Sequence, residues 1–294
     1  MSKVWLITGS SRGLGRDLAK AVLAAGDRLV ATARRVEDLR ELATEYGDRV
    51  RAVALDVTDP AAARRAVMLA VSAFGRLDVV VNNAGYANVN SIEHLPEEDF
   101  RAQFDTNFFG VVNVTRAALP VLREQRAGHV IQISSIGGRL GSPGLAAYQA
   151  AKWAVGGFSE VLAKEVGPLG VRVTIVEPGG MRTDWAGPSM RIDEVHPDYQ
   201  ATIGAFRQRV GHAEDVMRGD PRKVAELVLR IASEKEPPLR VLAGSDAVFL
   251  AGVVAGARAA EDATWRSLSV STDFDGLADF AETPVAKMLL AKKG

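Results

Sequence analysis

Seven short runs rich in valine, isoleucine and leucine recur along the chain, and longer stretches with helical periodicity separate them. The runs begin at Lys3, Asp27, Val50, Leu77, His129, Val171 and Leu239. Strands that are buried on both faces need continuous apolarity of this kind, whereas half-exposed strands alternate. Because strand and helix alternate throughout, the pattern predicts an α/β fold. We expect a doubly wound sheet of seven mainly parallel strands, flanked by helices on both faces.

This alternation continues without interruption to about residue 245. No Ser/Pro-rich stretch, charge block or repeat marks a linker before that point. We therefore expect a single domain over residues 1–245 and a C-terminal extension over residues 246–294. Residues 181–219, called the flap below, mix apolar, aromatic and turn residues, a composition that suits a mobile flap better than a packed layer.

Charge and cysteine content exclude several classes of protein. Lys plus Arg and Asp plus Glu both number 36, so neither nucleic acid nor an anionic membrane surface is an expected partner. The absence of cysteine excludes disulfides, thiolate metal sites and a cysteine nucleophile, and we expect no metal. The longest run of apolar residues and glycine, 247–257, is too short to cross a bilayer. With no signal peptide among the first residues, we expect a cytoplasmic protein that acts on a small molecule.

A glycine-rich turn follows the first predicted strand. Gly9, Gly13 and Gly15 have the spacing GxxxGxG and lead into a helical stretch. Glycines at a strand-to-helix turn let the backbone approach a pyrophosphate, so the turn predicts a dinucleotide site. Two alternatives are a tight turn without a ligand and the G-x-S-x-G nucleophile elbow of a serine hydrolase, centred on Ser11. The elbow needs an oxyanion-hole loop earlier in the chain, yet only eight residues precede Gly9.

Six of the predicted strands end in residues that suit a ligand site, at the sheet edge where doubly wound folds bind ligands. The second strand ends in Arg34, where a carboxylate for a ribose 2′-hydroxyl would be expected. Together with Arg12 of the glycine turn, Arg34 could grip a 2′-phosphate, which favours NADP(H) as the cofactor. The alternative is that Arg34 and Arg35 are solvated charges at a helix start, paired with Glu37 or Asp38.

Tyr148 and Lys152 are four residues apart in a stretch with helical period, so their side chains share one helix face. A tyrosine that works as an acid–base catalyst needs its pKa lowered from about 10 to near 7, which takes about 4 kcal/mol. A neighbouring ammonium and a cationic nicotinamide ring would supply much of that energy. For the pair taken alone, an amphipathic surface helix with a half-buried tyrosine is the alternative.

Taken together, these motifs resemble the short-chain dehydrogenase/reductase family in its compact single-domain branch. The chain has the GxxxGxG turn, NNAG from Asn82, a serine (Ser135) thirteen residues before Tyr148, the YxxxK pair and a Pro-Gly after the sixth strand. The match covers about residues 3–245. The resemblance implies a Rossmann-type fold, a homodimer or homotetramer, and an NADP(H)-dependent oxidoreductase that moves a hydride between nicotinamide and a carbonyl or secondary alcohol carbon. The alternative is a non-catalytic NADP-binding sensor or scaffold, although such proteins usually lose the tyrosine or the lysine.

The resemblance also implies roles for the catalytic residues. Tyr148 would exchange a proton with the substrate oxygen, and Ser135 would hydrogen-bond that oxygen. Lys152 would bind the nicotinamide ribose and lower the pKa of the tyrosine. Asn107 would kink its helix and hold a water of the proton relay, unless it is an ordinary asparagine inside a helix. Ser134 competes with Ser135, but the family spacing selects Ser135.

For the cofactor, the resemblance implies a path along the sheet edge. Asp56 would bond the adenine amino group, and residues 178–183 would hold the carboxamide. The full expected set is Gly9, Ser11, Arg12, Gly13, Leu14, Gly15, Arg34, Asp56, Val57, Asn83, Ala84, Gly85, Tyr148, Lys152, Pro178, Gly179, Met181 and Thr183.

Apolar side chains of the flap and of nearby loops predict a roomy apolar pocket. They are Tyr86, Leu140, Met181, Trp185, Met190, Tyr199 and Phe206. We therefore expect a bulky apolar ketone or alcohol as substrate, held by Ser135, Tyr148, Leu140 and Trp185. The alternative is that these side chains pack the flap onto the core.

Overall fold

The computed structural model describes residues 2–182, 190–192, 194–211 and 217–291. The chain divides into two compact units, residues 1–251 and residues 252–294.

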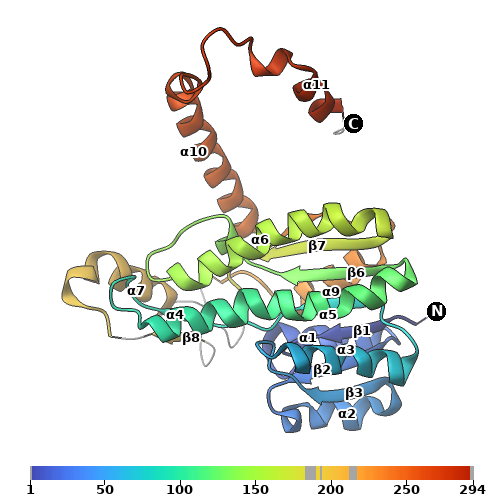
Figure 1. Ribbon diagram of the computed structural model, residues 1–294. Coiled ribbons are helices and arrows are strands. Elements are labelled where there is room, and N and C mark those ends of the chain that lie inside the picture. The colour runs from blue at the N-terminus through green and yellow to red at the C-terminus, as the bar shows by residue number, and fades with distance from the viewer. Residues whose placement is uncertain (1, 183–189, 193, 212–216, 292–294) are drawn as a thin grey trace. The chain divides into compact units, whose positions relative to one another are not determined.

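Seven parallel strands form the central sheet of the first unit, in the order β3-β2-β1-β4-β6-β7-β9 (Figure 1). They are β1 (Val4–Ile7), β2 (Arg28–Ala33), β3 (Val50–Ala54), β4 (Val79–Asn82), β6 (Gly128–Ile133), β7 (Val171–Pro178) and β9 (Arg240–Ala243). Each of the seven predicted runs forms one of these strands, so the predicted doubly wound α/β fold is confirmed. Every neighbouring pair is parallel, and all the carboxyl ends therefore lie at one edge.

Helices cover both faces of this sheet (Figure 1). One face carries α1 (Gly13–Ala24), α2 (Arg40–Tyr46) and α9 (Pro221–Ser233), and the other carries α3 (Pro60–Phe74), α5 (Gly110–Gln125) and α6 (Ala146–Val166). β1 illustrates the arrangement, because successive side chains of a strand point to opposite faces. Trp5 and Ile7 pack with α1 and α9, whereas Val4 and Leu6 pack with α3 and α5.

Aspartates set the start of two of these helices. Asp59 Oδ1 accepts the N–H of Ala61 at 2.7 Å at the start of α3, and Asp220 Oδ1 accepts the N–H of Arg222 at 2.9 Å at the start of α9. In both helices a proline follows the aspartate, at a position where its missing N–H costs nothing.

A separate two-stranded sheet lies outside the main one. β5 (Ala87–Val89) pairs in parallel with β8 (Met190–Ile192), and Arg191 of β8 forms an ion pair with Asp99 of α4 (Glu97–Phe104). β8 and α7 (Ala205–Gly211) both belong to the flap. The flap therefore contains regular structure that its sequence pattern did not predict.

The second unit holds most of α10 (Ser245–Val270), a 3-10 turn at Phe280–Glu282 and α11 (Pro284–Ala291). The division between the two units falls within α10, and the domain boundary after residue 245 stays a prediction. Large apolar side chains such as Trp265, Phe274 and Leu290 are exposed in this unit.

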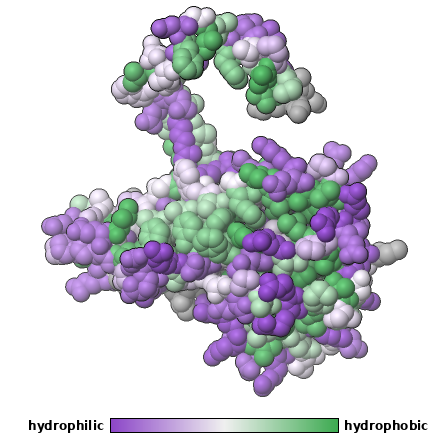
Figure 2. All heavy atoms as spheres, viewed as in Figure 1, coloured by the Kyte–Doolittle hydropathy of each residue, from purple (hydrophilic) through white to green (hydrophobic). Residues whose placement is uncertain are grey.

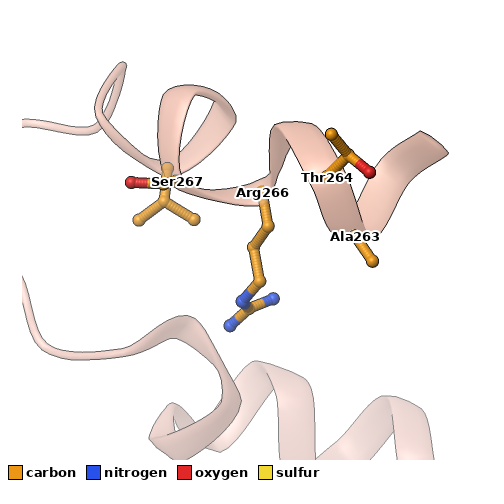
Figure 3. Close-up of a pocket in the computed structure, with 5 residues that line it drawn as sticks. Ala263, Thr264, Arg266 and Ser267 are labelled. Carbon is orange, nitrogen blue, oxygen red and sulfur yellow. The ribbon is translucent and has the colours of Figure 1, made fainter. Parts of the chain in front are cut away.

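A hollow of about 450 Å³ lies on the second unit, where the Arg266 side chain extends away from its helix (Figure 3). Its lining residues are Ala263, Thr264, Arg266, Ser267 and Val270. All five come from α10, so the hollow lacks the polar groups converging from several elements that a ligand site has.

Within the described ranges, no helix is both long and apolar enough to cross a membrane. The same residues contain no group of three or more His, Asp or Glu side chains that could hold a metal ion.

Candidate active site

The glycine turn between β1 and α1 has a backbone conformation and a close packing that residues with a β-carbon could not adopt without strain. Gly9 and Gly13 have positive φ angles of 70° and 51°, which glycine adopts without strain. A β-carbon on Gly15 would lie 2.1 Å from the carbonyl oxygen of Gly9, so the strand and the helix meet at a distance that only glycine allows. No side chain of the described residues caps the N-terminus of α1. Its first N–H groups therefore suit an external anion such as a pyrophosphate.

Arg12 and Arg34 follow the carboxyl ends of neighbouring strands, β1 and β2. Both are exposed, and neither forms an ion pair within the part of the chain that the structure describes. It is Arg35 that pairs with Asp38, at 2.7 Å. The alternative of a paired helix-start charge therefore holds for Arg35 and not for Arg34.

Thr8 and Asn83 tie the glycine turn to the end of β4. Thr8 Oγ1 accepts the N–H groups of Asn83 and Ala84 at 2.9 and 3.0 Å. Asn83 Nδ2 donates to the carbonyl oxygen of Thr8 at 3.0 Å. The side chain of Asn83, expected at the cofactor, thus supports the turn. Sequence reasoning missed Thr8, for which the position directly before Gly9 was the only signal.

Ser135, Tyr148 and Lys152 meet at the carboxyl end of β6. Ser135 is hydrogen-bonded to Tyr148, and its Oγ accepts the N–H of Gly137 at 3.0 Å. Lys152 Nζ lies 5.6 Å from the centre of the Tyr148 ring and donates to the carbonyl oxygen of Ile133 at 2.9 Å. Tyr148 and Lys152 are 7% and 5% exposed, so they lie on a buried face of α6 rather than on a surface helix.

Ser134 has a different neighbour. Its hydroxyl donates to the carbonyl oxygen of Lys152 at 3.4 Å, on the backbone of α6. Of the two adjacent serines, Ser135 is the one that the structure places against Tyr148.

Burial dominates the protonation of Tyr148 and Lys152. It raises the pKa of Tyr148 to about 12, opposed by the hydrogen bond from Ser135, and it lowers the pKa of Lys152 to about 8. Desolvation disfavours the charged form of each group. The chain's own residues therefore hold Tyr148 as a neutral phenol at pH 7, and the lowering of its pKa by Lys152 stays a prediction.

Asn107 lies in a π-helical turn, Asp105–Phe109, between α4 and α5, and is completely buried. Its side-chain amide donates to the carbonyl oxygens of Tyr86 and Gln103 at 2.9 and 2.8 Å. A β-carbon on Gly85 would lie 2.5 Å from Asn107 Oδ1 and 3.7 Å from Lys152 Nζ. Asn107 is thus a neighbour of the lysine, in a distorted turn of a kind that is frequent at functional sites.

Asp56 and Val57 follow β3 on the same edge. Asp56 Oδ1 accepts the N–H and the hydroxyl of Thr58 at 2.9 and 2.7 Å, which leaves the carboxylate exposed in a fixed turn. Val57 packs closely on α5, since a β-carbon on Gly110 would lie 2.5 Å from its Cγ2.

Pro178 ends β7, and the expected carboxamide segment follows it. The backbone of Met181 forms a bridge with Gly219. Thr183 and Trp185, expected at the cofactor and at the substrate, lie outside the described residues.

Apolar flap residues pack around Tyr148. The buried cluster consists of Ala87, Val89, Leu145, Tyr148, Met190, Val195 and Ile203, with Tyr199 and Phe206 packed against it. These flap side chains therefore contact the core and also border the phenol. Leu140 lies in another cluster, with Ile136 and Ala247.

A parallel sheet with a glycine turn at its carboxyl edge, next to a buried Ser–Tyr–Lys set, defines a dinucleotide-binding protein of the Rossmann type.

Comparisons with known proteins identify the family within this class. Residues 3–192 match the family described as short chain dehydrogenase. Oxidoreductase BOA17 of Botryotinia fuckeliana (strain B05.10) is 52% identical over 273 residues, covering 92% of this chain and 100% of the relative. The chain belongs to the short-chain dehydrogenase family, which is a family of oxidoreductases.

Further similarities concern structure and ligands. A short-chain dehydrogenase from Streptomyces avermitilis has a TM-score of 0.87 and 40% identity, with 92% of this chain and 98% of that chain covered. An alcohol dehydrogenase from Thermococcus sibiricus, complexed with 5-hydroxy-NADP, has a TM-score of 0.67 and 27% identity, with 82% and 96% covered. A 3-ketodihydrosphingosine reductase of Bacteroides thetaiotaomicron is 36% identical, with 82% and 88% covered. Family and neighbours together support a nicotinamide cofactor, which the glycine turn and the uncapped helix start fit.

Proposed function

We propose that the chain is an NADP(H)-dependent oxidoreductase acting on a bulky apolar ketone or secondary alcohol, with Tyr148 as the general acid and base. The buried contact of Tyr148 with Ser135 and Lys152, beside the glycine turn, carries this proposal. Two exposed arginines without ion-pair partners in the described ranges, Arg12 and Arg34, support the 2′-phosphorylated cofactor.

The chain's own residues would handle the proton. When bound, the nicotinamide dinucleotide supplies the hydride in the reducing direction. Ser135 accepts the N–H of Gly137 and donates its one hydroxyl proton to Tyr148, and a bound substrate oxygen would take over this donated hydrogen bond. Tyr148 is held as a neutral phenol and can donate its proton to the oxygen of a carbonyl that is being reduced. The protonation state of the buried tyrosine therefore favours reduction.

An apolar substrate is supported by the surroundings of the phenol. Tyr148 is buried among aliphatic side chains and flap residues such as Met190. Binding an apolar ligand against these side chains is favourable, because it removes apolar surface from water. One relative is named 3-ketodihydrosphingosine reductase, which agrees with a ketone as the substrate class.

A homodimer or homotetramer is proposed from the exposed apolar residues near α5 and α6. Phe109, Trp153 and Val161 are 49%, 43% and 56% exposed, and Figure 2 shows apolar residues gathered over these two helices. Isolated exposed apolar residues are normal, but a continuous patch marks an interface. Light scattering tests the proposal, since a monomeric wild type would contradict it.

The enzyme assay follows the oxidation of NADPH by its loss of absorbance. The substrates are ketones and aldehydes that differ stepwise in size and polarity. We expect the largest kcat/KM for bulky apolar carbonyls. Tyr148→Phe should lower turnover by about 10²- to 10⁴-fold and leave NADPH binding intact, because only the transferable proton is lost. Tyr46→Phe, on α2 and away from the site, is the matched control. Full turnover by Tyr148→Phe would show that the tyrosine is not the acid, and no turnover of any carbonyl or alcohol would contradict the function.

A further inference from the structure

A carboxylate from the start of α10 holds the turn that follows β7. The N–H of Gly180 donates to Asp246 Oδ2 at 2.7 Å, across 66 residues of sequence. The N–H of the preceding residue, Gly179, donates to the carbonyl oxygen of Ala243 at the end of β9. Asp246 lies beyond residues 3–192, which match the family, and no motif in the sequence pointed to it.

This carboxylate occupies the space where a side chain of Gly179 would lie. A β-carbon on Gly179 would come within 2.2 and 2.3 Å of the two Asp246 oxygens. A β-carbon on Gly244, whose φ is +114°, would come within 2.5 Å of Oδ1. Atoms do not approach so closely, so the absence of both side chains makes room for the carboxylate. Gly179, Gly244 and Asp246 therefore form one packed unit.

The second oxygen of Asp246 has an unfavourable position. Oδ1 is buried and has no hydrogen-bond partner among the described residues. Burying a carboxylate oxygen without a donor costs free energy, which an apolar side chain at the same place would avoid. Packing stability alone therefore does not account for an aspartate at this position, whereas the placing of the Gly180 peptide does.

The next peptide group, between Gly180 and Met181, is also held. The carbonyl oxygen of Gly180 accepts the N–H of Gly219 at 2.9 Å, and the N–H of Arg182 donates back to Gly219 at 3.1 Å. Because both its N–H and its carbonyl are engaged, the Gly180 residue has a fixed orientation. Asp246 supplies a charged partner in this arrangement, and a charge-assisted hydrogen bond is about twice as strong as a neutral one.

We propose that Asp246 is a positioning residue that fixes the turn at residues 178–180, so that its backbone can bind the nicotinamide end of the dinucleotide. The inference rests on the proposed function and on the family resemblance, which implies that residues 178–183 hold the carboxamide while Arg34 meets the 2′-phosphate at the adenosine end. β7 is separated from β1 in the sheet by β4 and β6. Loss of Asp246 should therefore affect one end of the cofactor and spare the other.

Asp246→Ala removes the acceptor and should weaken NADPH binding about tenfold, measured by titrating NADPH fluorescence. Binding of adenosine 2′,5′-bisphosphate, which has only the adenosine end, should not change. Asp246→Asn keeps an oxygen for the Gly180 N–H and should recover most of the NADPH affinity. Asp262→Ala, an exposed position on the same helix, is the matched control and should bind both ligands like the wild type.

The outcomes separate this inference from the proposed function. Wild-type NADPH affinity in Asp246→Ala overturns the inference alone, and so does an equal loss for both ligands, which would indicate damage to the whole fold. Should that variant not fold, Gly244→Ala decides, since its β-carbon displaces the Asp246 carboxylate and should weaken NADPH binding selectively. A wild-type protein that binds neither ligand overturns the proposed function and this inference with it.

Discussion

Replacing Lys152 by methionine should stabilise the folded protein while it abolishes turnover. Lys152 is 5% exposed, and burial lowers its pKa from 10.5 to about 8. At 1.36 kcal/mol for each pH unit, keeping this ammonium in the folded protein at pH 7 costs about 3 kcal/mol. Methionine has a similar length and carries no charge, so the variant avoids that cost.

The substitution also removes a hydrogen bond, which offsets part of the gain in stability. Lys152 Nζ donates to the carbonyl oxygen of Ile133 at 2.9 Å, and methionine leaves that oxygen without this donor. An unmade hydrogen bond of this kind costs about 1 kcal/mol. The net expectation is an increase of about 2 kcal/mol in the free energy of unfolding at pH 7. Such gains are common where a residue needed for activity destabilises the folded protein.

This advantage should disappear as the pH rises. Below about pH 8 the lysine is charged in both the folded and the unfolded chain, so the full cost is present. Between about pH 8 and 10.5 the folded protein loses the proton while the unfolded chain keeps it, so the wild type gains stability with rising pH. Near pH 10.5 only the hydrogen bond separates the two proteins, and the wild type becomes the more stable one.

Urea unfolding of both proteins at pH 7 and pH 10, without ligand, measures the difference. Lys164→Met, at an exposed position of the same helix, is the control and should change stability little. A Lys152→Met protein that is less stable than the wild type at pH 7, or an advantage that does not shrink with pH, would refute the reasoning from burial.

Three further outcomes follow from charged and titrating groups. Arg34→Asp should remove the preference for NADPH over NADH in a comparison of kcat/KM. If the preference is retained, residues other than Arg34 bind the 2′-phosphate. Glu177 is 1% exposed and bonded to Arg139 and Arg240, so Glu177→Gln should lower the free energy of unfolding by about 3 kcal/mol in urea. Burial lowers the pKa of His129 to about 3, so the wild type should lose about 1.4 kcal/mol for each pH unit below 6.5 relative to His129→Gln. If the difference in the free energy of unfolding between the wild type and His129→Gln is the same at pH 7 and pH 5, the prediction for His129 is wrong.

The main sheet was predictable because its strands are buried on both faces. All four residues of β1 are buried, and this leaves a continuous apolar run in the sequence. β5 and β8 have three residues each, which is too short for a recognisable period, and they pair across a hundred residues. For the same reason the short strand of the flap, β8, left no recognisable pattern in the sequence.

The candidate site divides in the same way. Glycine spacing predicted the turn at Gly9, and the resemblance to a known family gave the serine, the tyrosine and the lysine. The resemblance implied that Asn107 kinks its helix, but the bond that it makes to the backbone of Tyr86, on another segment, was not evident from the sequence. Thr8 and Asp246 carry no motif at all.

The sequence by itself determined what depends on neighbours along the chain: the strands, the glycine turn, and the shared helix face of Tyr148 and Lys152, which four residues of one helix bring together. Only the tertiary structure decided which serine contacts the tyrosine, that Arg35 rather than Arg34 is paired, and that the phenol and the ammonium are both desolvated. Burial and contacts between distant segments arise when the sheet and helices close around a side chain. Asp246 acquires its role in this way, because folding brings its carboxylate to a peptide 66 residues earlier in the chain.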